Sequence, residues 1–379
     1  MISKRKIVFL TGTRADYGKI KPVARALRDS GRYDVYIFAT GMHLLHRYGY
    51  TVKAVMREFP DVYLFNNQAS STHPERALAS TINGFSSFVS DLQPDMILVH
   101  GDRPEALAGA IVGSFNNLLV AHIEGGEVSG TIDEAIRHSI TKLAHIHLVS
   151  NNTAQARLIQ LGERKDKIFV VGSPEVDIML SAELPTLVDV KAHYEIPFDH
   201  YAISILHPVT TELENQEVAS KSYFHSLAEV GGNFIVVHPN NDLGGTIIEK
   251  QLEFLQDKDR FRVFPSIEFE SFLTLLKHCL FIIGNSSAGI REAPVFNRWS
   301  VNIGSRQHQR SSGHTIIHVS EEDPTEIREA INHVREHPDP PHGPNFEFGD
   351  GNSVGNILNT FSDNDLWNTS RQKQFIPFS

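Results

Sequence analysis

Short apolar runs alternate with helix-length segments along nearly the whole chain, and this alternation restricts the possible folds more than any other feature. Short runs of this kind, ending in glycine or polar residues, are typical of strands buried on both faces of a parallel sheet. Strands that alternate with helices predict an α/β protein with doubly wound parallel sheets. The expected strands cover residues 6–12, 35–39, 96–99, 118–121, 147–149, 168–172, 202–206, 234–237, 261–264, 280–283, 301–303 and 316–319.

Prolines interrupt the alternation near residues 173–200, after which it begins again. This break predicts two Rossmann-like domains, one over residues 1–172 and one over 173–362. A helix near residues 363–379 is expected to return and complete the first domain. Two such halves favour a cleft between them, lined by the carboxyl ends of strands from both sides.

Two late segments are expected to be loops, and residues 44–75 give no clear pattern. Residues 338–344 are rich in proline, and residues 349–355 are rich in glycine and asparagine. Such compositions favour turns over regular structure.

The composition excludes several classes of function. The net charge of −10 argues against a nucleic-acid partner, because binding to phosphates needs a surplus of cations. No apolar run approaches the roughly 20 residues of a membrane span. The single cysteine, Cys279, excludes a disulfide framework and fits a reducing compartment, so we expect a cytoplasmic protein.

Acidic residues gather after the apolar run at residues 118–121. Glu124 and Glu127 directly follow this expected strand, and Asp133 falls on the first turn of the expected helix that comes next. The carboxyl ends of parallel strands form the ligand-binding edge of such sheets, which makes these acids candidates for acid–base chemistry. The alternative is a solvated loop in which Asp133 only interacts favourably with the helix dipole. An apolar stripe of Ile132, Ile136, Ile140 and Leu143 is expected to bury this helix.

Two glycine-framed turns are candidates for anion binding. The first, residues 12–19, carries Arg14 and Lys19; the second, residues 284–294, carries serines at the expected start of a helix. Backbone N–H groups at such turns point toward a bound anion, although each turn is also compatible with ordinary strand–helix packing. Neither turn is a dinucleotide fingerprint or a Walker A sequence.

Four histidines, at positions 100, 122, 207 and 238, stand at the ends of expected strands. A histidine in such a place is often a hydrogen-bonded structural group and not a catalyst. Their spacing does not match a local zinc motif, and we therefore expect no metal ligand among them.

The motifs at residues 12–18, 100–103, 122–127, 137–139, 207–212 and 284–294 occur together and in this order. As a set they resemble the hydrolysing UDP-N-acetylglucosamine 2-epimerases, most closely the branch of bacterial sialic acid and capsule polysaccharide biosynthesis. The likeness covers nearly the whole chain. Non-hydrolysing relatives resemble Gly-Thr-Arg-Pro-Glu at the first turn, so the sequence Ala15-Asp16-Tyr17 favours the hydrolysing branch.

The resemblance implies a GT-B-like fold of two Rossmann-like domains. It also implies an enzyme that converts UDP-GlcNAc and water to UDP and N-acetylmannosamine, without a cofactor, as a homodimer or homotetramer. The implied catalytic acids are Asp102, Glu124 and Asp133. The implied UDP-sugar ligands are Arg14, Lys19, Arg103, His207, Ser286, Ser287, Arg291 and, for the ribose, Glu292. Which acid removes a proton and which supplies one stays open.

Four other functions are compatible with parts of this pattern. The substrate of a hydrolysing 2-epimerase could be a UDP-2,4-diacetamido-2,4,6-trideoxy sugar of a legionaminic-type pathway, or the enzyme could be a non-hydrolysing UDP-GlcNAc 2-epimerase. A glycosyltransferase shares the architecture but needs an acceptor. A sensor that only binds nucleotide sugars is disfavoured, since acids beside a diphosphate weaken simple binding.

Overall fold

The chain forms two compact units in the computed structural model, which describes residues 4–67, 73–255, 257–307, 310–311, 313–320, 323–374 and 376. The first unit comprises Met1–Glu127, Asp133–Leu180 and Glu347–Ser379, and the second comprises Val128–Ile132 and Ser181–Phe346. None of the helices in the described ranges is both long and apolar enough to cross a membrane.

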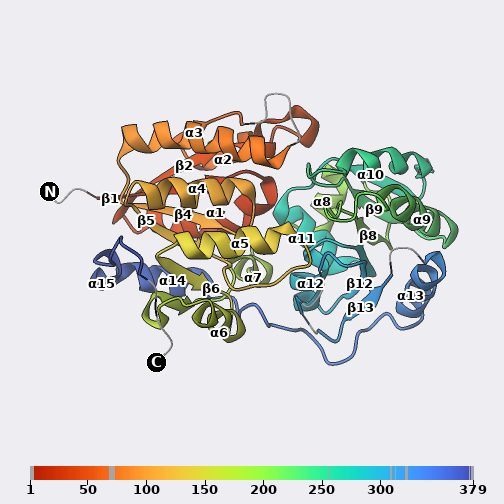
Figure 1. Ribbon diagram of the computed structural model, residues 1–379. Helices are drawn as coiled ribbons and strands as arrows, with labels where there is room; N and C mark the ends of the chain where they lie inside the picture. The colour runs from red at the N-terminus through yellow and green to blue at the C-terminus, as the bar shows by residue number, and fades with distance from the viewer. Residues whose placement is uncertain are drawn as a thin grey trace. The chain divides into compact units, whose positions relative to one another are not determined.

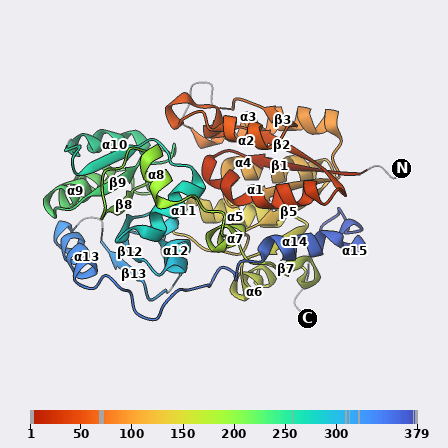
Figure 2. The same cartoon turned by 180° about the vertical axis from the view of Figure 1, so that it is seen from behind.

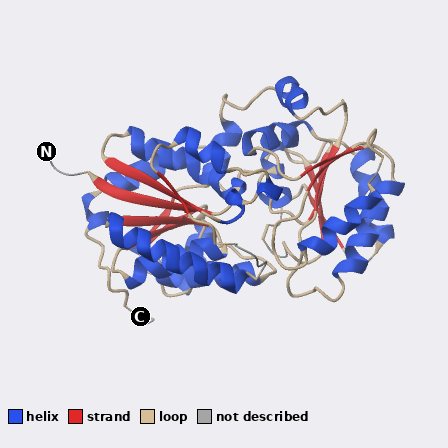
Figure 3. Cartoon of the chain, turned by 90° about the horizontal axis from the view of Figure 1, so that it is seen from above, coloured by secondary structure: helices blue, strands red, loops and turns tan. Residues whose placement is uncertain are grey.

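The first unit is built on a seven-stranded parallel sheet of order β3-β2-β1-β4-β5-β6-β7. Its strands are β1 (Arg5–Thr11), β2 (Tyr33–Ala39), β3 (Val62–Leu64), β4 (Met96–His100), β5 (Leu119–Ile123), β6 (Ile146–Val149) and β7 (Ile168–Val170). Its helices are α1 (Arg14–Asp29), α2 (Val52–Glu58), α3 (Pro74–Leu92), α4 (Pro104–Phe115), α5 (Ile132–Leu143), α6 (Asn152–Gln160), α7 (Pro174–Leu180), α14 (Ser353–Ser362) and α15 (Asn364–Trp367). Helices cover both faces of the sheet (Figures 1 and 3).

The second unit repeats the design with a six-stranded parallel sheet of order β10-β9-β8-β11-β12-β13. Its strands are β8 (Ala202–Ile205), β9 (Phe234–Val237), β10 (Phe261–Phe264), β11 (Phe281–Gly284), β12 (Trp299–Ile303) and β13 (Ile316–Val319). Its helices are α8 (Leu187–His193), α9 (Gln216–Glu229), α10 (Gly245–Gln251), α11 (Phe269–His278), α12 (Ala288–Arg291) and α13 (Pro324–Glu336). The predicted fold class of two parallel-sheet α/β domains is confirmed.

The strand order reverses once in each sheet, and the sequence motifs follow the strands at these points. In the first unit the reversal lies between β1 and β4, and in the second it lies between β8 and β11. Open α/β sheets bind ligands outside the carboxyl ends of the strands at such a reversal. The turn after β1, the His100–Arg103 segment, His207 and the turn after β11 all lie at these two points.

Helix α5 begins at Ile132, as expected, and most of the predicted apolar stripe is confirmed. Ile140 is buried, and Ile136 and Leu143 are partly buried and pack against the core. The exception is Ile132, which is 51% exposed. Arg137 and Thr141 are also fully buried, which the apolar pattern did not predict.

The end of the chain also differs from expectation. The glycine-rich segment at residues 349–355 was expected to be a loop, but α14 begins inside it at Ser353. The helix expected near 363–379 is short, since α15 covers only Asn364–Trp367; residues 375 and 377–379 lie outside the described ones. Helix α14 packs on α1 and α7 (Figure 2), and Asp177 of α7 accepts the backbone N–H groups of Ser353 and Val354. The carboxylate that caps α14 comes from a residue 176 positions earlier, so the sequence around Ser353 does not indicate that a helix begins there.

A buried ion cluster fixes the segment after α15. The side chain of Glu163 is 2% exposed, and its carboxylate contacts Lys142 at 2.7 Å, His147 at 3.1 Å and Lys373 at 2.5 Å. Burial alone would raise the pKa of Glu163, but these hydrogen bonds outweigh it and lower the pKa to about 2. The carboxylate is therefore fully ionised and paired at neutral pH.

The ammonium of Lys373 also satisfies the end of α5. It donates to the carbonyl oxygens of Thr141 at 3.0 Å and Ala144 at 2.7 Å. Nearby, His145 Nε2 donates to the carbonyl of Arg371 at 3.0 Å. The ammonium thus donates hydrogen bonds to carbonyl groups that have no intrahelical partner at the end of a helix.

Lys373→Met is expected to lower the free energy of unfolding by about 3 kcal/mol, because it leaves Glu163 buried with one partner fewer. The control, Lys142→Met, removes a cation whose side chain is 54% exposed and should cost under about 1 kcal/mol. Urea unfolding measures both, and equal losses would contradict this assignment.

The same cluster predicts how stability depends on pH. Burial lowers the pKa of both His145 and His147 from 6.5, so the unfolded chain binds these protons more readily. Stability should therefore decline as the pH falls below about 6.5. The pKa of Glu163 is also lowered, from 4.5, which predicts a further loss between pH 4.5 and about 2. Urea unfolding at a series of pH values measures this, and stability that rises on acidification would contradict it.

Candidate active site

Glu124 directly follows β5 and is held in an unusual backbone conformation. Its φ is +73°, in the left-handed region that costs a residue with a side chain roughly 1–2 kcal/mol. The residue is 5% exposed. A buried acid kept at such a cost points to a functional requirement.

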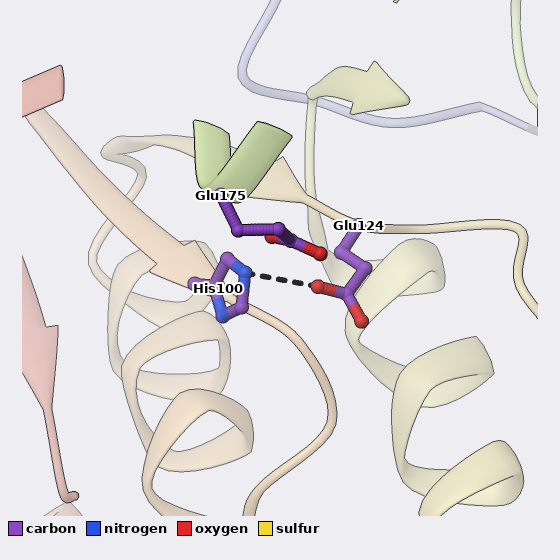
Figure 4. A group of neighbouring side chains, drawn as sticks. All are labelled: His100, Glu124 and Glu175. Atoms are coloured by element: carbon purple, nitrogen blue, oxygen red, sulfur yellow. Dashed lines mark ion pairs between the residues drawn. The ribbon is translucent and has the colours of Figure 1, made fainter. Parts of the chain in front are cut away.

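Three buried side chains lie around this carboxylate. His100 Nε2, at the end of β4, lies 3.0 Å from Glu124 Oε2. Lys19 Nζ, from α1, lies 3.9 Å from the same oxygen and 3.4 Å from Glu175 Oε1 of α7. Figure 4 shows His100, Glu124 and Glu175 converging from three different elements. Lys19 and Glu124 were predicted site residues, whereas Glu175 was missed because it is far away in sequence.

Asp102 follows His100 by two residues and pairs with an arginine that is absent from the predicted site. Its carboxylate makes an ion pair with Arg137 of α5, which is 0% exposed. Arg137 also donates to the carbonyl of Glu127 at 3.1 Å, and Glu127 accepts from Ser150 Oγ at 3.1 Å. The signal for Arg137 was its position four residues after Asp133, which puts both on the same side of α5.

Asp133 lies on the first turn of α5, as predicted, and is partly exposed. The loop that precedes it belongs to the second unit, where the N–H of Gly130 donates to the carbonyl of Arg306 at 3.1 Å. A Cβ on Gly130 would lie 2.2 Å from the carbonyl oxygen of Ser305, so only glycine fits.

The glycine turn after β1 is capped by a carboxylate of its own chain segment. Asp16 accepts the N–H groups of Gly12 and Thr13 at 2.9 Å each, and the N–H of Asp16 donates to Thr13 Oγ1 at 3.2 Å. These two N–H groups are therefore occupied, and anion binding by the rest of the turn stays a prediction. The turn's two cations are Arg14, the first residue of α1, and Lys19, further along that helix.

A buried histidine and a buried acid complete the surroundings of this turn. His43 Nε2 lies 3.0 Å from Thr11 Oγ1, and burial lowers its pKa to about 4, so it is neutral. Glu105 is 3% exposed and contacts Arg103 at 3.4 Å. A Cβ on Gly12 would lie only 2.9 Å from Glu105, which explains the glycine there.

His122 is a structural histidine, in line with the simpler of its two interpretations. It is 0% exposed, and its Nε2 donates to the carbonyl of Gly101 at 2.8 Å. Burial lowers its pKa to about 3 and keeps it neutral.

In the second unit, His207 and Asn285 join the ends of β8 and β11. Asn285 Oδ1 accepts the N–H of His207 at 2.7 Å, and its Nδ2 donates to the His207 carbonyl at 2.8 Å. The N–H of Asn240 donates to His207 Nδ1 at 3.1 Å, so the neutral ring carries its proton on Nε2. This fixes the ring at the strand reversal, and the role of Asn285 was not foreseen.

The other predicted ligands of this unit differ in exposure. Ser286 and Ser287 are partly exposed at the start of α12, a helix of only four residues. Arg291, the last residue of α12, and Glu292, which follows it, are 1% and 3% exposed, so both are buried inside the protein.

His100, Glu124 and Glu175 have donor atoms within 4.8 Å of one another, a spacing compatible with a metal ion. The ammonium of Lys19 already lies beside both carboxylates, however. A divalent ion there would be repelled by this charge. The expectation of no metal ligand among the strand-end histidines stays a prediction.

A family profile described as UDP-N-acetylglucosamine 2-epimerase matches residues 25–362. This chain belongs to the UDP-N-acetylglucosamine 2-epimerase family. It is 44% identical to a UDP-N-acetylglucosamine 2-epimerase of Neisseria meningitidis serogroup B, over 98% of this chain and 99% of that one. It is 35% identical to the UDP-N,N'-diacetylbacillosamine 2-epimerase (hydrolyzing) of Legionella pneumophila, over 86% and 89% of the two chains. It is 33% identical to the polysialic acid biosynthesis protein P7 of Escherichia coli, over 83% and 82%.

Solved structures show the same fold for this epimerase family member. The UDP-GlcNAc 2-epimerase of Neisseria meningitidis, solved bound to UDP-GlcNAc, has a TM-score of 0.79 at 19% identity, covering 94% of this chain and 99% of that one. The Methanocaldococcus jannaschii enzyme, solved with UDP-GlcNAc and UDP, has a TM-score of 0.76 at 21% identity, with 94% and 99% covered. The chain is thus an enzyme of this family with the family's fold.

Proposed function

We propose that this epimerase hydrolyses UDP-GlcNAc to UDP and N-acetylmannosamine, the first step of sialic acid biosynthesis, in the cytoplasm. The observation that carries the proposal is the convergence of His100, Lys19 and the strained Glu124 at the strand reversal of the first unit. Two relatives whose names include "hydrolyzing" support the hydrolytic outcome. The polysialic acid relative supports the pathway.

The chemistry explains why several acids are needed. The C2 proton of GlcNAc is not next to a carbonyl and is too weakly acidic to be removed directly. Breaking the C1–O bond to UDP builds positive charge at C1, which makes that proton acidic. A carboxylate removes it and leaves a 2-acetamidoglucal and UDP. Water then adds its oxygen to C1 while a proton returns to C2 from the opposite face.

We assign acid and base roles to Asp102, Glu124 and Asp133, and leave open which of them acts in which step. Arg14, Lys19 and Arg103 are proposed to stabilise the departing UDP from the first unit. In the second unit the proposed UDP ligands are His207, Ser286, Ser287, Arg291 and Glu292. We also propose a homodimer or homotetramer. No redox cofactor is needed, because elimination of UDP and addition of water transfer no hydride in either step.

Incubating the protein with UDP-GlcNAc and identifying the sugar by NMR tests the proposal. N-acetylmannosamine with deuterium at C2 is expected in D2O, because C2 loses its proton and regains one from solvent. In water labelled with ¹⁸O, the label should appear at C1 of the sugar and not in UDP. Label found in UDP would reject C1–O cleavage.

A second candidate is hydrolysis of a UDP-2,4-diacetamido-2,4,6-trideoxy sugar. The Legionella and Campylobacter relatives, at 35% and 32% identity, are named for the diacetylbacillosamine nucleotide. Comparing kcat/KM for the two UDP-sugars separates the candidates. Free UDP-N-acetylmannosamine as the product would instead identify a non-hydrolysing enzyme.

A further inference from the structure

Glu175 is a fully buried acid that the proposed chemistry leaves without a role. It is 0% exposed and lies on the first turn of α7, which packs on α1. Its Oε1 accepts a hydrogen bond from Lys19 Nζ at 3.4 Å, across 156 residues of sequence. An ionised carboxylate is rarely buried so completely unless it has a paired charge, and Lys19 supplies one.

Two carboxylates share the ammonium of Lys19, and they are not equivalent. Glu175 lies at 3.4 Å and Glu124 at 3.9 Å, so the ammonium is closer to Glu175. Glu124 Oε2 has a shorter contact, of 3.0 Å, to His100. Glu175 thus attracts the ammonium of Lys19 in competition with Glu124. Figure 4 shows the two carboxylates together with His100.

This sharing matters for a carboxylate that must accept a proton. A direct ion pair with an ammonium stabilises the charged form and makes a carboxylate a weaker base. If Glu175 were neutral, it would attract the ammonium of Lys19 less, and the pull of Glu124 would increase relative to it. Lys19 would then shift from the position in which it faces both acids.

We propose that Glu175 is a positioning residue that holds Lys19 and keeps its ammonium from moving closer to Glu124. This inference rests on the proposed function, in which Lys19 contacts UDP and Glu124 is an acid or base. Glu175 acts through Lys19 and touches no substrate in this scheme.

A double-mutant cycle tests the proposal. Glu175→Gln should lower kcat at least about 10-fold, and Lys19→Met should lower it further. The double variant should equal Lys19→Met within about two-fold, because Glu175 has nothing to position once the ammonium is gone. Losses that multiply in the double variant would overturn the proposal. Glu175→Asp keeps the charge, so its kcat should be at least about five-fold higher than that of Glu175→Gln. If Glu175→Gln does not fold, the kcat of Glu175→Asp is compared with that of the wild type and of Lys19→Met.

Asp177→Asn is the matched control in the same helix. Asp177 caps α14 through the N–H groups of Ser353 and Val354 and lies outside the charged group. It should lower the Tm but change kcat per folded molecule less than two-fold. If Asp177→Asn reduces kcat as strongly as Glu175→Gln, the effect of Glu175 is merely structural.

A spectroscopic measurement keeps this test independent of the proposed reaction. With ¹⁵N-labelled lysine, the Nζ resonance of Lys19, identified by its loss in Lys19→Met, should be protected from exchange in the wild type. It should shift or disappear in Glu175→Gln, whether or not UDP-GlcNAc is turned over. An unchanged resonance would overturn the proposal, and so would activity that chelators abolish and added metal restores. Failure of the reaction itself would appear separately, as no sugar released by the wild type.

Discussion

Glu124→Gln is expected to lower kcat at least about 10²-fold, because an amide can neither accept nor return the proton at C2. The fold should survive, since glutamine has the same shape and Lys19 keeps Glu175 as a partner. Steady-state release of UDP measures the effect. The control is Glu134→Gln, which neutralises a partly exposed acid on α5 and should stay within about two-fold of the wild type. More than a tenth of wild-type turnover in Glu124→Gln would remove Glu124 from the catalytic group.

The backbone of Glu124 adds a second expectation about stability. At a φ of +73°, glycine is strain-free while alanine is not. Glu124→Gly should therefore be more stable than Glu124→Ala by about 1 kcal/mol, although both lack activity. Urea unfolding of the two variants measures this difference. Equal free energies of unfolding would show that the left-handed conformation of Glu124 has no energetic cost. The backbone of Glu124 would then give no reason to assign this residue a function.

Gly284→Ala is expected to reduce the free energy of unfolding by at least about 3 kcal/mol, or to prevent folding of the second unit. Gly284 ends β11 with a φ of +129°, and a Cβ there would lie 1.9 Å from the carbonyl oxygen of Ile205. That oxygen belongs to the neighbouring strand β8, so the clash cannot be relieved without parting two central strands. The neighbouring Asn285, which holds His207, would be displaced as well.

The matched control for this effect is Gly231→Ala. Gly231 also has a positive φ, of +70°, but nothing lies within 4 Å of its added Cβ. It should cost only about 1 kcal/mol, the price of a left-handed conformation for a residue with a side chain. Thermal or urea unfolding distinguishes the two variants, and a similar cost at both positions would show that the close approach to Ile205 is unimportant.

Periodic and local features were readable from the sequence alone. Buried parallel strands are continuous apolar runs, so the positions of the strands and the repetition of the doubly wound pattern followed directly. The polar residues after those strands had to lie at the carboxyl edges, which placed Glu124 after β5 and His207 after β8. The expected cleft between the two halves stays a prediction.

Contacts between distant segments required the tertiary structure. Arg137 pairs with Asp102, and Glu175 reaches Lys19 from 156 residues away. The spacing of Asp133 and Arg137 placed both on one side of α5, but it did not identify Asp102 as the partner of Arg137. Apolar periodicity located most of the buried face of α5, but it gave no sign of the buried Arg137, which is satisfied by groups outside that helix. The sequence therefore determined where the chemistry gathers, and the fold decided which charges face one another there.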